Sequence, residues 1–353
     1  MSETIVSALE RARAKLYAIA GGSIDSDNVR AAKLTTAQRI EYFRSAEFRQ
    51  WVASEKAAGR EVFWLKDVDK TQSAGDIFTF FFKWRADNHK FTSKQLTVIR
   101  RFLRQQHKLL SRKPTVPAAA SLLPHNVVHL WVAKETGAGD GIGLLDFWSG
   151  AYWPSQIGLS QKEKLAQVAE FIPFYAAKVY PGVAEENRML EEAGVHVVIV
   201  SNGDQELAIA AAPTLGVKPE NVVGSHLIYG ADGISTGVNH SYEVFGADWH
   251  NRPQPGKSLS FHYWLHANRS RFGWKAISDL TTVIAGRDGD SASTDGGMMI
   301  LLAPPAIGNF MIDTPGEPDR IAKFYSVAAK YGWTRGQFFT LVQSPSQSGR
   351  IPD

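Results

Sequence analysis

The sequence predicts an α/β fold in which a doubly wound parallel sheet carries a mainly helical cap inserted after its first strand. Three observations lead to this prediction. The short apolar run 62–65 ends at two aspartates, Asp67 and Asp69. From residue 183 onward, helical patterns alternate with continuous apolar runs such as "VHVVIV" and "LTTVIAG", the order expected of a parallel sheet with helices on both faces. Residues 76–180, between these regions, are mostly helical in pattern.

The elements follow one another in three sections of the chain. Residues 1–58 place charged and apolar positions at helical spacing, as in "TAQRIEYFRSAEFRQWVASEKA", so we predict a helical leader packed on the core. Residues 59–75 and 181–353 form the predicted core, and residues 76–180 form the predicted cap. The stretches "SRKPTVPAAASLLPHN" and "TGAGDGIG" in the cap are predicted loops.

Inside the core, each apolar run has a flanking signal. The helical pattern "AEENRMLEEAG" ends at Gly194, a suitable glycine for the end of a helix, and the run "VHVVIV" follows it. A hairpin is predicted in "VVGSHLIYGADGISTGV", with its turn at Asp232 and Gly233. The segment "GKSLSFHYWLHANR" is helical in pattern, and the strand "LTTVIAG" leads into the polar loop "RDGDSASTDGG".

The composition excludes several classes of site and favours a globular protein. Of the 353 residues, 44% are hydrophobic and 21% are charged, which is ordinary for a globular protein. The chain has no cysteine, which excludes disulfides, thiolate metal sites and a cysteine nucleophile. No apolar run reaches the length of a signal peptide core or a membrane span, so we expect a cytoplasmic protein without a membrane partner.

Positive charge is concentrated between residues 83 and 113, which contain ten lysines and arginines and a single acid, Asp87. This run is either a solvated helix face or a patch that attracts an anionic substrate. No nucleic-acid-binding motif accompanies it, so we expect no nucleic-acid partner.

Polar clusters fall at the ends of four predicted core elements. Because the carboxyl ends of parallel strands meet at one edge of a sheet, these clusters are expected to converge in one crevice. The first cluster is Asp67, Asp69 and Thr71, the second is Ser201, Asn202 and Gly203, the third is Lys257, and the fourth is Asp290 with Asp295.

The order and spacing of these clusters resemble the haloacid dehalogenase superfamily of phosphotransferases over roughly residues 60–300. The matching motifs are "DVDKT", "VVIVSNG", "GKSLS" and "GDSASTD". The resemblance implies that Asp67 is a nucleophile that forms an aspartyl-phosphate. It implies that Asp69 is the general acid and then the base, and that the backbone carbonyl of Asp69 binds the metal.

The remaining motif residues take supporting roles by the same resemblance. Lys257 would offset the charge of Asp67 and the phosphate, Asp290 would bind the metal, and Asp295 would support the metal shell. Asp288, two residues before Asp290, is an alternative metal ligand, although Asp290 completes the motif. The residues expected to bind the phosphoryl group are Thr71, Ser201, Asn202, Gly203 and Lys257.

Each assignment has a plainer alternative. Asp67 and Asp69 could form a solvated turn, Ser201 could cap the following helix, and Lys257 could be a surface lysine. A cation at a helix start is unfavourable beside the helix dipole, which argues against that last alternative.

These roles predict a Mg²⁺-dependent phosphomonoesterase acting on a small-molecule phosphate. A carboxylate attacks an anion poorly unless a cation screens their repulsion, and Mg²⁺ prefers oxygen ligands. The alternatives are a catalytically silent phospholigand-binding or interaction protein on the same fold, which the unusual Lys66 and Lys70 favour, and a phosphotransferase or phosphomutase. The protein is expected to be a monomer or a homodimer.

Within the superfamily, the chain is most similar to the phosphorylcholine phosphatase and phosphoserine phosphatase-like group. Choline-specific members carry acids soon after the first motif, whereas Asp76 is the only acid in "QSAGDIFTFFFKW". We therefore predict a neutral or anionic leaving group. Helical spacing favours a packing role for Phe78, Phe81, Phe82 and Trp84, and both packing and ligand contact stay open for Trp131, Trp148, Tyr152 and Trp153.

Overall fold

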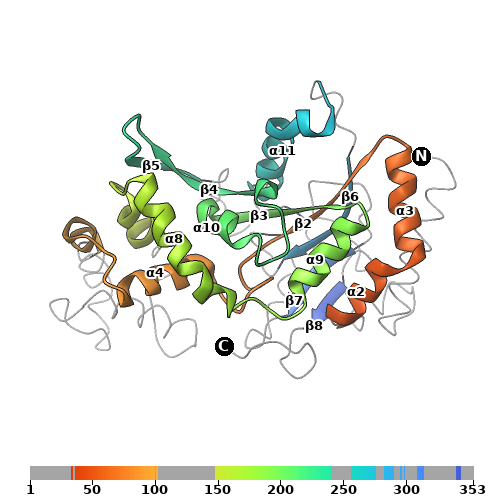
Figure 1. Ribbon diagram of the computed structural model, residues 1–353, viewed down its shortest axis with the longest axis horizontal. Helices are drawn as coiled ribbons and strands as arrows, with labels where there is room; N and C mark the ends of the chain where they lie inside the picture. Colours follow the sequence, from red (N-terminus) through yellow and green to blue (C-terminus); the bar gives the residue numbers. More distant parts are fainter. Residues whose placement is uncertain are drawn as a thin grey trace, which may run out of the picture. The chain divides into compact units, whose positions relative to one another are not determined.

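The computed structural model describes residues 33–34, 36–99, 101, 148–240, 256–275, 282–289, 295, 298, 308–313 and 339–342 (Figure 1). Contacts divide the chain into two compact units. The first unit comprises Met1–Asp76, Ala176–Ser225 and His240–Asp353, and the second comprises Ile77–Tyr175 and His226–Asn239.

The first unit is built on a parallel sheet, which confirms the predicted α/β class. The strands lie in the order β1-β8-β7-β6-β2-β3-β4, and every neighbouring pair in this order is parallel. The chain leaves β2 toward β3 and β4, then returns to β6 on the other side of β2, so the winding direction changes beside β2. Ligands of open α/β sheets bind at such a switch point. The strands are β1 (Lys33–Leu34), β2 (Glu61–Lys66), β3 (His196–Asp204), β4 (Val222–Tyr229), β6 (Thr282–Gly289), β7 (Gly308–Asp313) and β8 (Phe339–Val342).

Helices cover both faces of this sheet, as a doubly wound fold requires (Figure 1). Successive side chains of a strand point to opposite faces. Phe63 of β2 accordingly lies 5.5 Å from Phe261 of α11, ring to ring, while Trp64 lies 4.9 Å from Phe43 of α2. The helical elements of the first unit are α2 (Thr36–Arg44), α3 (Ala46–Ala57), α9 (Val183–Glu192), α10 (Gln205–Ala211), η5 (Pro219–Asn221), α11 (Gly256–Asn268) and η6 (Arg269–Phe272).

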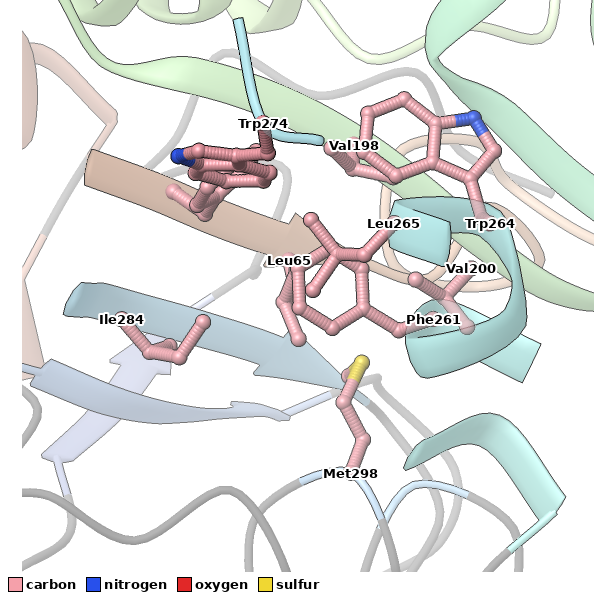
Figure 2. Close-up of a cluster of buried hydrophobic side chains, with 10 residues drawn as sticks. Leu65, Val198, Val200, Phe261, Trp264, Leu265, Trp274, Ile284 and Met298 are labelled. Atoms are coloured by element: carbon pink, nitrogen blue, oxygen red, sulfur yellow. The ribbon is translucent and has the colours of Figure 1, made fainter. Parts of the chain in front are cut away.

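The apolar cluster beneath α11 fixes this helix on the sheet. Figure 2 shows Phe261 and Leu265 of α11 beside Leu65 of β2 and Ile284 of β6, all of them buried. Burial of each large apolar side chain stabilises the fold by about 1.5–3 kcal/mol. Because Lys257 belongs to the first turn of α11, this cluster also fixes the position of the lysine backbone.

A glycine in β6 makes room for the largest side chain of β2. A Cβ atom at Gly286 would lie 2.3 Å from Cζ2 of Trp64, which no real Cβ tolerates. The indole therefore packs directly on the β6 backbone, at the place where the register between β2 and β6 shifts by one residue. This contact explains the glycine in the run "VIAG".

In the predicted helical leader, α2 and α3 are helices, but β1 is a strand of the sheet and pairs with β8. Residues 1–32 and 35 lie outside the described residues. Ser45 caps α3, accepting a hydrogen bond from the backbone N–H of Phe48 at 3.3 Å. In the described ranges, no helix combines the length and the apolar character needed to cross a membrane.

The second unit contains α4 (Ile77–Asp87), η3 (Trp148–Tyr152), η4 (Pro154–Gln156), α8 (Gln161–Ala176) and β5 (Ser235–Asn239). It also holds the last residues of β4, which pair antiparallel with β5. The predicted hairpin is confirmed, with Gly233 in its turn at φ 73°. Contacts group this hairpin with the second unit, whereas the sequence predicts that it belongs to the core. The role of residues 76–180 as a cap stays a prediction.

Aromatic side chains form the interior of the second unit. Phe78, Phe81 and Phe82 are buried, in keeping with the predicted packing role. Phe78 stacks on Trp148 with ring centroids 5.1 Å apart, and Tyr152 and Trp153 are buried as well. Trp131 lies outside the described residues.

The described part of the basic run does not form one solvated face. Arg85 is fully buried and donates a hydrogen bond of 3.1 Å to Oε1 of Gln95. Lys90 forms an ion pair with Glu170 at 2.7 Å. Residues 100 and 102–113 of this run lie outside the described residues.

Candidate functional site

Asp67 follows directly after the last residue of β2, at the switch point of the sheet. Its peptide is held on both sides. The backbone N–H of Asp67 donates to the carbonyl oxygen of Asp288 at 3.0 Å, and the carbonyl oxygen of Asp67 accepts from Nε2 of Gln72 at 2.7 Å. The side chain of Asp67 therefore extends from a rigid point.

Lys257 brings two of the predicted acids together. Its ammonium lies 2.5 Å from Oδ1 of Asp67 and also forms an ion pair with Oδ1 of Asp295. The exposed fractions of the side chains are 2% for Lys257, 7% for Asp67 and 0% for Asp295. The alternatives of a surface lysine and of a solvated turn at Asp67 are therefore wrong.

The environment shifts the pKa of both partners. Burial raises the pKa of Asp67 to about 6, Lys257 opposes this rise, and Asp295 adds to it. Burial lowers the pKa of Lys257, but Asp295 and Asp67 outweigh that effect, so the net shift of its pKa is upward. These shifts favour the charged form of Lys257 at neutral pH and the protonated form of Asp67 below about pH 6.

Gly289 determines how closely Asp295 approaches the end of β6. A Cβ atom at residue 289 would lie 2.4 Å from Cβ of Asp295 and 2.7 Å from its carboxyl carbon. Only glycine permits this approach. The motif "GDSASTD" thus requires glycine at its first position for steric reasons, and the spacing of the motif does not indicate this requirement.

The second cluster ends β3, the neighbour of β2. The hydroxyl of Ser201 is buried and accepts a hydrogen bond from the backbone N–H of Gly203 at 2.9 Å. The cap of α10 is Asp204, which accepts from the N–H groups of the helix start. The alternative in which Ser201 caps this helix is therefore wrong. The carbonyl of Asn202 accepts a hydrogen bond of 2.9 Å from Ser225.

Thr71 and Asp69 lie in the turn after Asp67. The hydroxyl of Thr71 is 3.5 Å from Oδ2 of Asp67, a long contact, and Thr71 is buried. Asp69 is partly exposed. Between Asp69 and Thr71, Lys70 adopts a left-handed conformation with φ 56°, and its ammonium lies 3.6 Å from Oδ2 of Asp76.

The fourth cluster is described only in part, because Asp290 lies outside the described residues. Its alternative, Asp288, is engaged elsewhere: Oδ2 of Asp288 lies 2.7 Å from Nη2 of Arg39 and 3.3 Å from Nζ of Lys66. A carboxylate paired with two cations is a poor metal ligand. The choice of Asp290 over Asp288 as the metal ligand stays a prediction.

Lys66, the unusual lysine that precedes Asp67, forms ion pairs with two other acids. The partners of its ammonium are the carboxylates of Glu186 and Asp288. We call Arg39, Lys66, Glu186 and Asp288 the buried charge cluster. The sequence analysis did not predict Arg39 and Glu186. The only sequence feature that could have indicated them is a charged residue within an amphipathic helical pattern.

The donor set suits a hard divalent cation. Asp67 and Asp295 contribute carboxylate oxygens around one ammonium, so negative charge is in excess. Oxygen donors of this kind are the ligands that Mg²⁺ prefers. Among the described residues, however, no three histidines, cysteines, aspartates or glutamates gather into a complete metal site.

No protein-family profile matches the sequence, and no curated protein is significantly similar to it. Solved structures give more distant similarities. A protein of unknown function from Bordetella pertussis Tohama I shares 14% identity at a TM-score of 0.45, over 80% of this chain and 98% of that one. Cytosolic 5′-nucleotidase IIIB bound to cytidine shares 12% identity at a TM-score of 0.45, over 86% of each chain.

A phosphoserine phosphohydrolase-like protein from Francisella tularensis shares 12% identity at a TM-score of 0.38, over 75% of this chain and 92% of that one. The solved structures similar to this chain thus include phosphatases. Similarity at this level does not assign the chain to a family.

Proposed function

We propose that the protein is a Mg²⁺-dependent phosphatase that hydrolyses a small organic phosphate through a covalent phosphate on Asp67. The observation that carries this proposal is the buried contact of Lys257 with both Asp67 and Asp295 at the switch point of the sheet. A nucleophilic carboxylate needs a fixed cation beside it to receive a phosphate dianion.

Charge balance supports a metal at this place. Two buried carboxylates and one ammonium leave an excess of negative charge, which would repel phosphate. Asp67, the backbone carbonyl of Asp69 and Asp290 would hold Mg²⁺, with Asp295 in support. When bound, the ion would offset the charge of the phosphoryl oxygens.

The reaction would proceed in two displacements. In the first, a carboxylate oxygen of Asp67 attacks phosphorus, the bond between phosphorus and the ester oxygen breaks, and Asp69 donates a proton to the leaving alcohol. In the second, Asp69 accepts a proton from a water molecule that attacks phosphorus. The bond between phosphorus and Asp67 then breaks, which releases phosphate and restores the carboxylate.

The remaining residues would bind and orient the phosphoryl group. Lys257 stays charged because Asp295 and Asp67 hold its pKa above the ordinary value, although burial lowers it. The end of β3 would contribute hydrogen bonds to phosphoryl oxygens through Ser201, Asn202 and Gly203. Asp69 is partly exposed, so it can exchange protons with solvent.

The leaving group is proposed to be neutral or anionic. Asp76, the only acid soon after the first motif, is buried and faces the ammonium of Lys70 at 3.6 Å. A carboxylate engaged in this way is a poor partner for a quaternary ammonium group. Catalytic efficiencies on phosphorylcholine and on sugar, nucleoside and amino-acid phosphates test this point, and a strong preference for phosphorylcholine would contradict it.

The experiment that tests the proposed function is release of p-nitrophenol from p-nitrophenyl phosphate. We expect turnover with Mg²⁺, none in excess chelator, and none by Asp67→Asn at any Mg²⁺ concentration. Phosphate binding without turnover by the wild-type protein would instead identify a silent phospholigand-binding protein.

A further inference from the structure

We propose that Arg39 of helix α2 is a positioning residue that fixes the backbone of Asp67 through Asp288. The inference rests on the proposed function only for its effect on turnover. The structural link between Arg39 and Asp67 can be tested without any activity.

The link consists of two successive contacts. Nη2 of Arg39 lies 2.7 Å from Oδ2 of Asp288, and the carbonyl oxygen of Asp288 accepts the backbone N–H of Asp67 at 3.0 Å. The side chain of Asp288 thus forms an ion pair with α2, while its backbone carbonyl accepts a hydrogen bond from Asp67. A displacement of its side chain would be transmitted to the peptide that carries the nucleophile.

The other members of the buried charge cluster strengthen this link. Lys66 immediately precedes Asp67, is paired in register with Asp288 in the sheet, and has its ammonium 3.3 Å from Oδ2 of Asp288. Lys66 also forms an ion pair with Glu186 of α9, which in turn lies 3.0 Å from Arg39. Two cations, Arg39 and Lys66, and one further anion, Glu186, therefore surround Asp288, whose carbonyl holds Asp67.

Arginine is well suited to this place. Its guanidinium reaches the carboxylates of both Glu186 and Asp288 while it lies 5.5 Å from the ring centroid of Trp64. Lysine would provide the charge but not the planar group that stacks on an indole. Side chains of the cluster are at most 4% exposed, so water contributes little solvation energy to their charges.

Burial of four charges needs a reason beyond stability. Desolvation of buried ion pairs often outweighs their attraction, and well-packed apolar side chains would serve as well or better. A cluster that orients a catalytic backbone has such a reason, because small displacements of a reacting group slow a reaction strongly. This argument favours positioning over a purely structural role.

The same helix offers a matched control. Arg44 of α2 pairs with Glu185 of α9 at 2.5 Å, just as Arg39 pairs with Glu186. The side chains of Arg44 and Glu185 are 52% and 41% exposed. An exposed pair of this kind contributes little, so Arg44→Met removes an arginine from the same helix without disturbing the buried charge cluster.

Hydrogen exchange of the peptide 62–72 measures the link directly. In the full-length protein, Arg39→Met is expected to accelerate exchange in this peptide well below the melting temperature, because the hydrogen bond from Asp67 to Asp288 opens more often. Arg39→Lys should restore part of the protection, because it keeps the charge but not the planar group, and Arg44→Met should leave it unchanged. Unchanged protection in Arg39→Met would overturn the inference.

Turnover of p-nitrophenyl phosphate with Mg²⁺ gives the second readout. We expect kcat to fall by about 10–100-fold in Arg39→Met, with a smaller change in KM. Wild-type kcat in Arg39→Met would overturn the inference. If the wild-type protein shows no turnover, the proposed function fails, while the exchange measurement still decides whether Arg39 positions Asp67.

A charge-balanced double variant separates positioning from stability. Arg39→Met leaves excess negative charge in the cluster, and Glu186→Gln in the same protein removes that excess. We expect the double variant to regain much of the lost melting temperature while peptide 62–72 stays less protected and kcat stays low. Recovery of protection and kcat together with the melting temperature would show a purely structural role. If Arg39→Met alone does not fold, the protection of peptide 62–72 and the kcat are measured in the double variant instead.

Discussion

The ammonium of Lys257 lies 2.5 Å from a carboxylate oxygen of Asp67, although 190 positions of the chain separate the two residues. The sheet makes this contact possible. Asp67 follows the last residue of β2, and the apolar face of α11 packs against β2 and β6, which brings the first turn of α11 to the same place. The contact is therefore a property of the fold and not of local sequence.

Replacement of Lys257 by methionine should weaken phosphate binding and abolish turnover. Asp67 and Asp295 would then lie buried without their cation, and breaking a buried pair in this way costs about 3–5 kcal/mol of unfolding free energy. Urea unfolding and inhibition by inorganic phosphate measure the two effects. Lys218→Met is the matched control, because Lys218 is 54% exposed in its ion pair with Glu191. Wild-type affinity for phosphate in Lys257→Met would contradict the assigned role.

Gly289→Ala should reduce turnover strongly because the new Cβ would displace Asp295 from the end of β6. The two Cβ atoms would be 2.4 Å apart, so the side chain or the strand must move. Gly237→Ala is the control, since the nearest atom to its added Cβ is Cδ1 of Ile228 at 3.6 Å. Steady-state kinetics and melting temperatures of both variants test this. Equal activity of the two variants would show that the position of Asp295 is unimportant.

In chelator, the contribution of Asp67 to the free energy of unfolding should fall as the pH rises through about 6. Burial is the main cause that raises the pKa of Asp67 from 3.8 to about 6, so the folded state binds this proton more tightly than the unfolded state. The stabilisation is complete below the unfolded value and is lost above the folded value, a change of about 3 kcal/mol. Asp67→Asn lacks this titration. Urea unfolding of both proteins between about pH 4 and about pH 7 should therefore show Asp67→Asn gaining relative stability, and a pH-independent difference would refute the assignment.

Asp69→Asn should slow hydrolysis by about 10²–10⁴-fold, the usual effect of removing a general acid and base. Metal binding should change little, because only the backbone carbonyl of Asp69 is assigned to the metal. Mg²⁺ titration by calorimetry and kcat across pH separate these effects. A wild-type rate at every pH would mean that another residue transfers the proton.

Sequence reasoning succeeded where local pattern and sheet geometry are sufficient. The apolar residues before Asp67 predict β2, and the shared edge of parallel strands predicts that Lys257 lies near Asp67 and Asp295. The first expectation depends on which side chains are apolar, and the second depends on the common direction of the strands and on the resemblance of the four motifs. The catalytic roles of these residues stay predictions.

Reasoning from sequence failed where distant residues determine the structure. Arg39 and Asp288 are 249 positions apart, and nothing in either segment indicates that they meet. The same holds for Trp64, whose indole requires a glycine at 286. The strand β1 has two residues, too few to show a pattern. Such contacts depend on packing between elements and leave no periodic signal.

Transfer of phosphate onto Asp67 is tested most directly by acid quenching during turnover, followed by mass spectrometry of the peptide that contains residue 67. With p-nitrophenyl phosphate and Mg²⁺, we predict a phosphate on Asp67 in the wild-type protein. Asp69→Asn should accumulate it if loss of the base slows hydrolysis of the intermediate more than its formation, and Asp67→Asn should carry none. Rapid turnover with no phosphate on this peptide at any quench time, or phosphate on another residue, would contradict the mechanism.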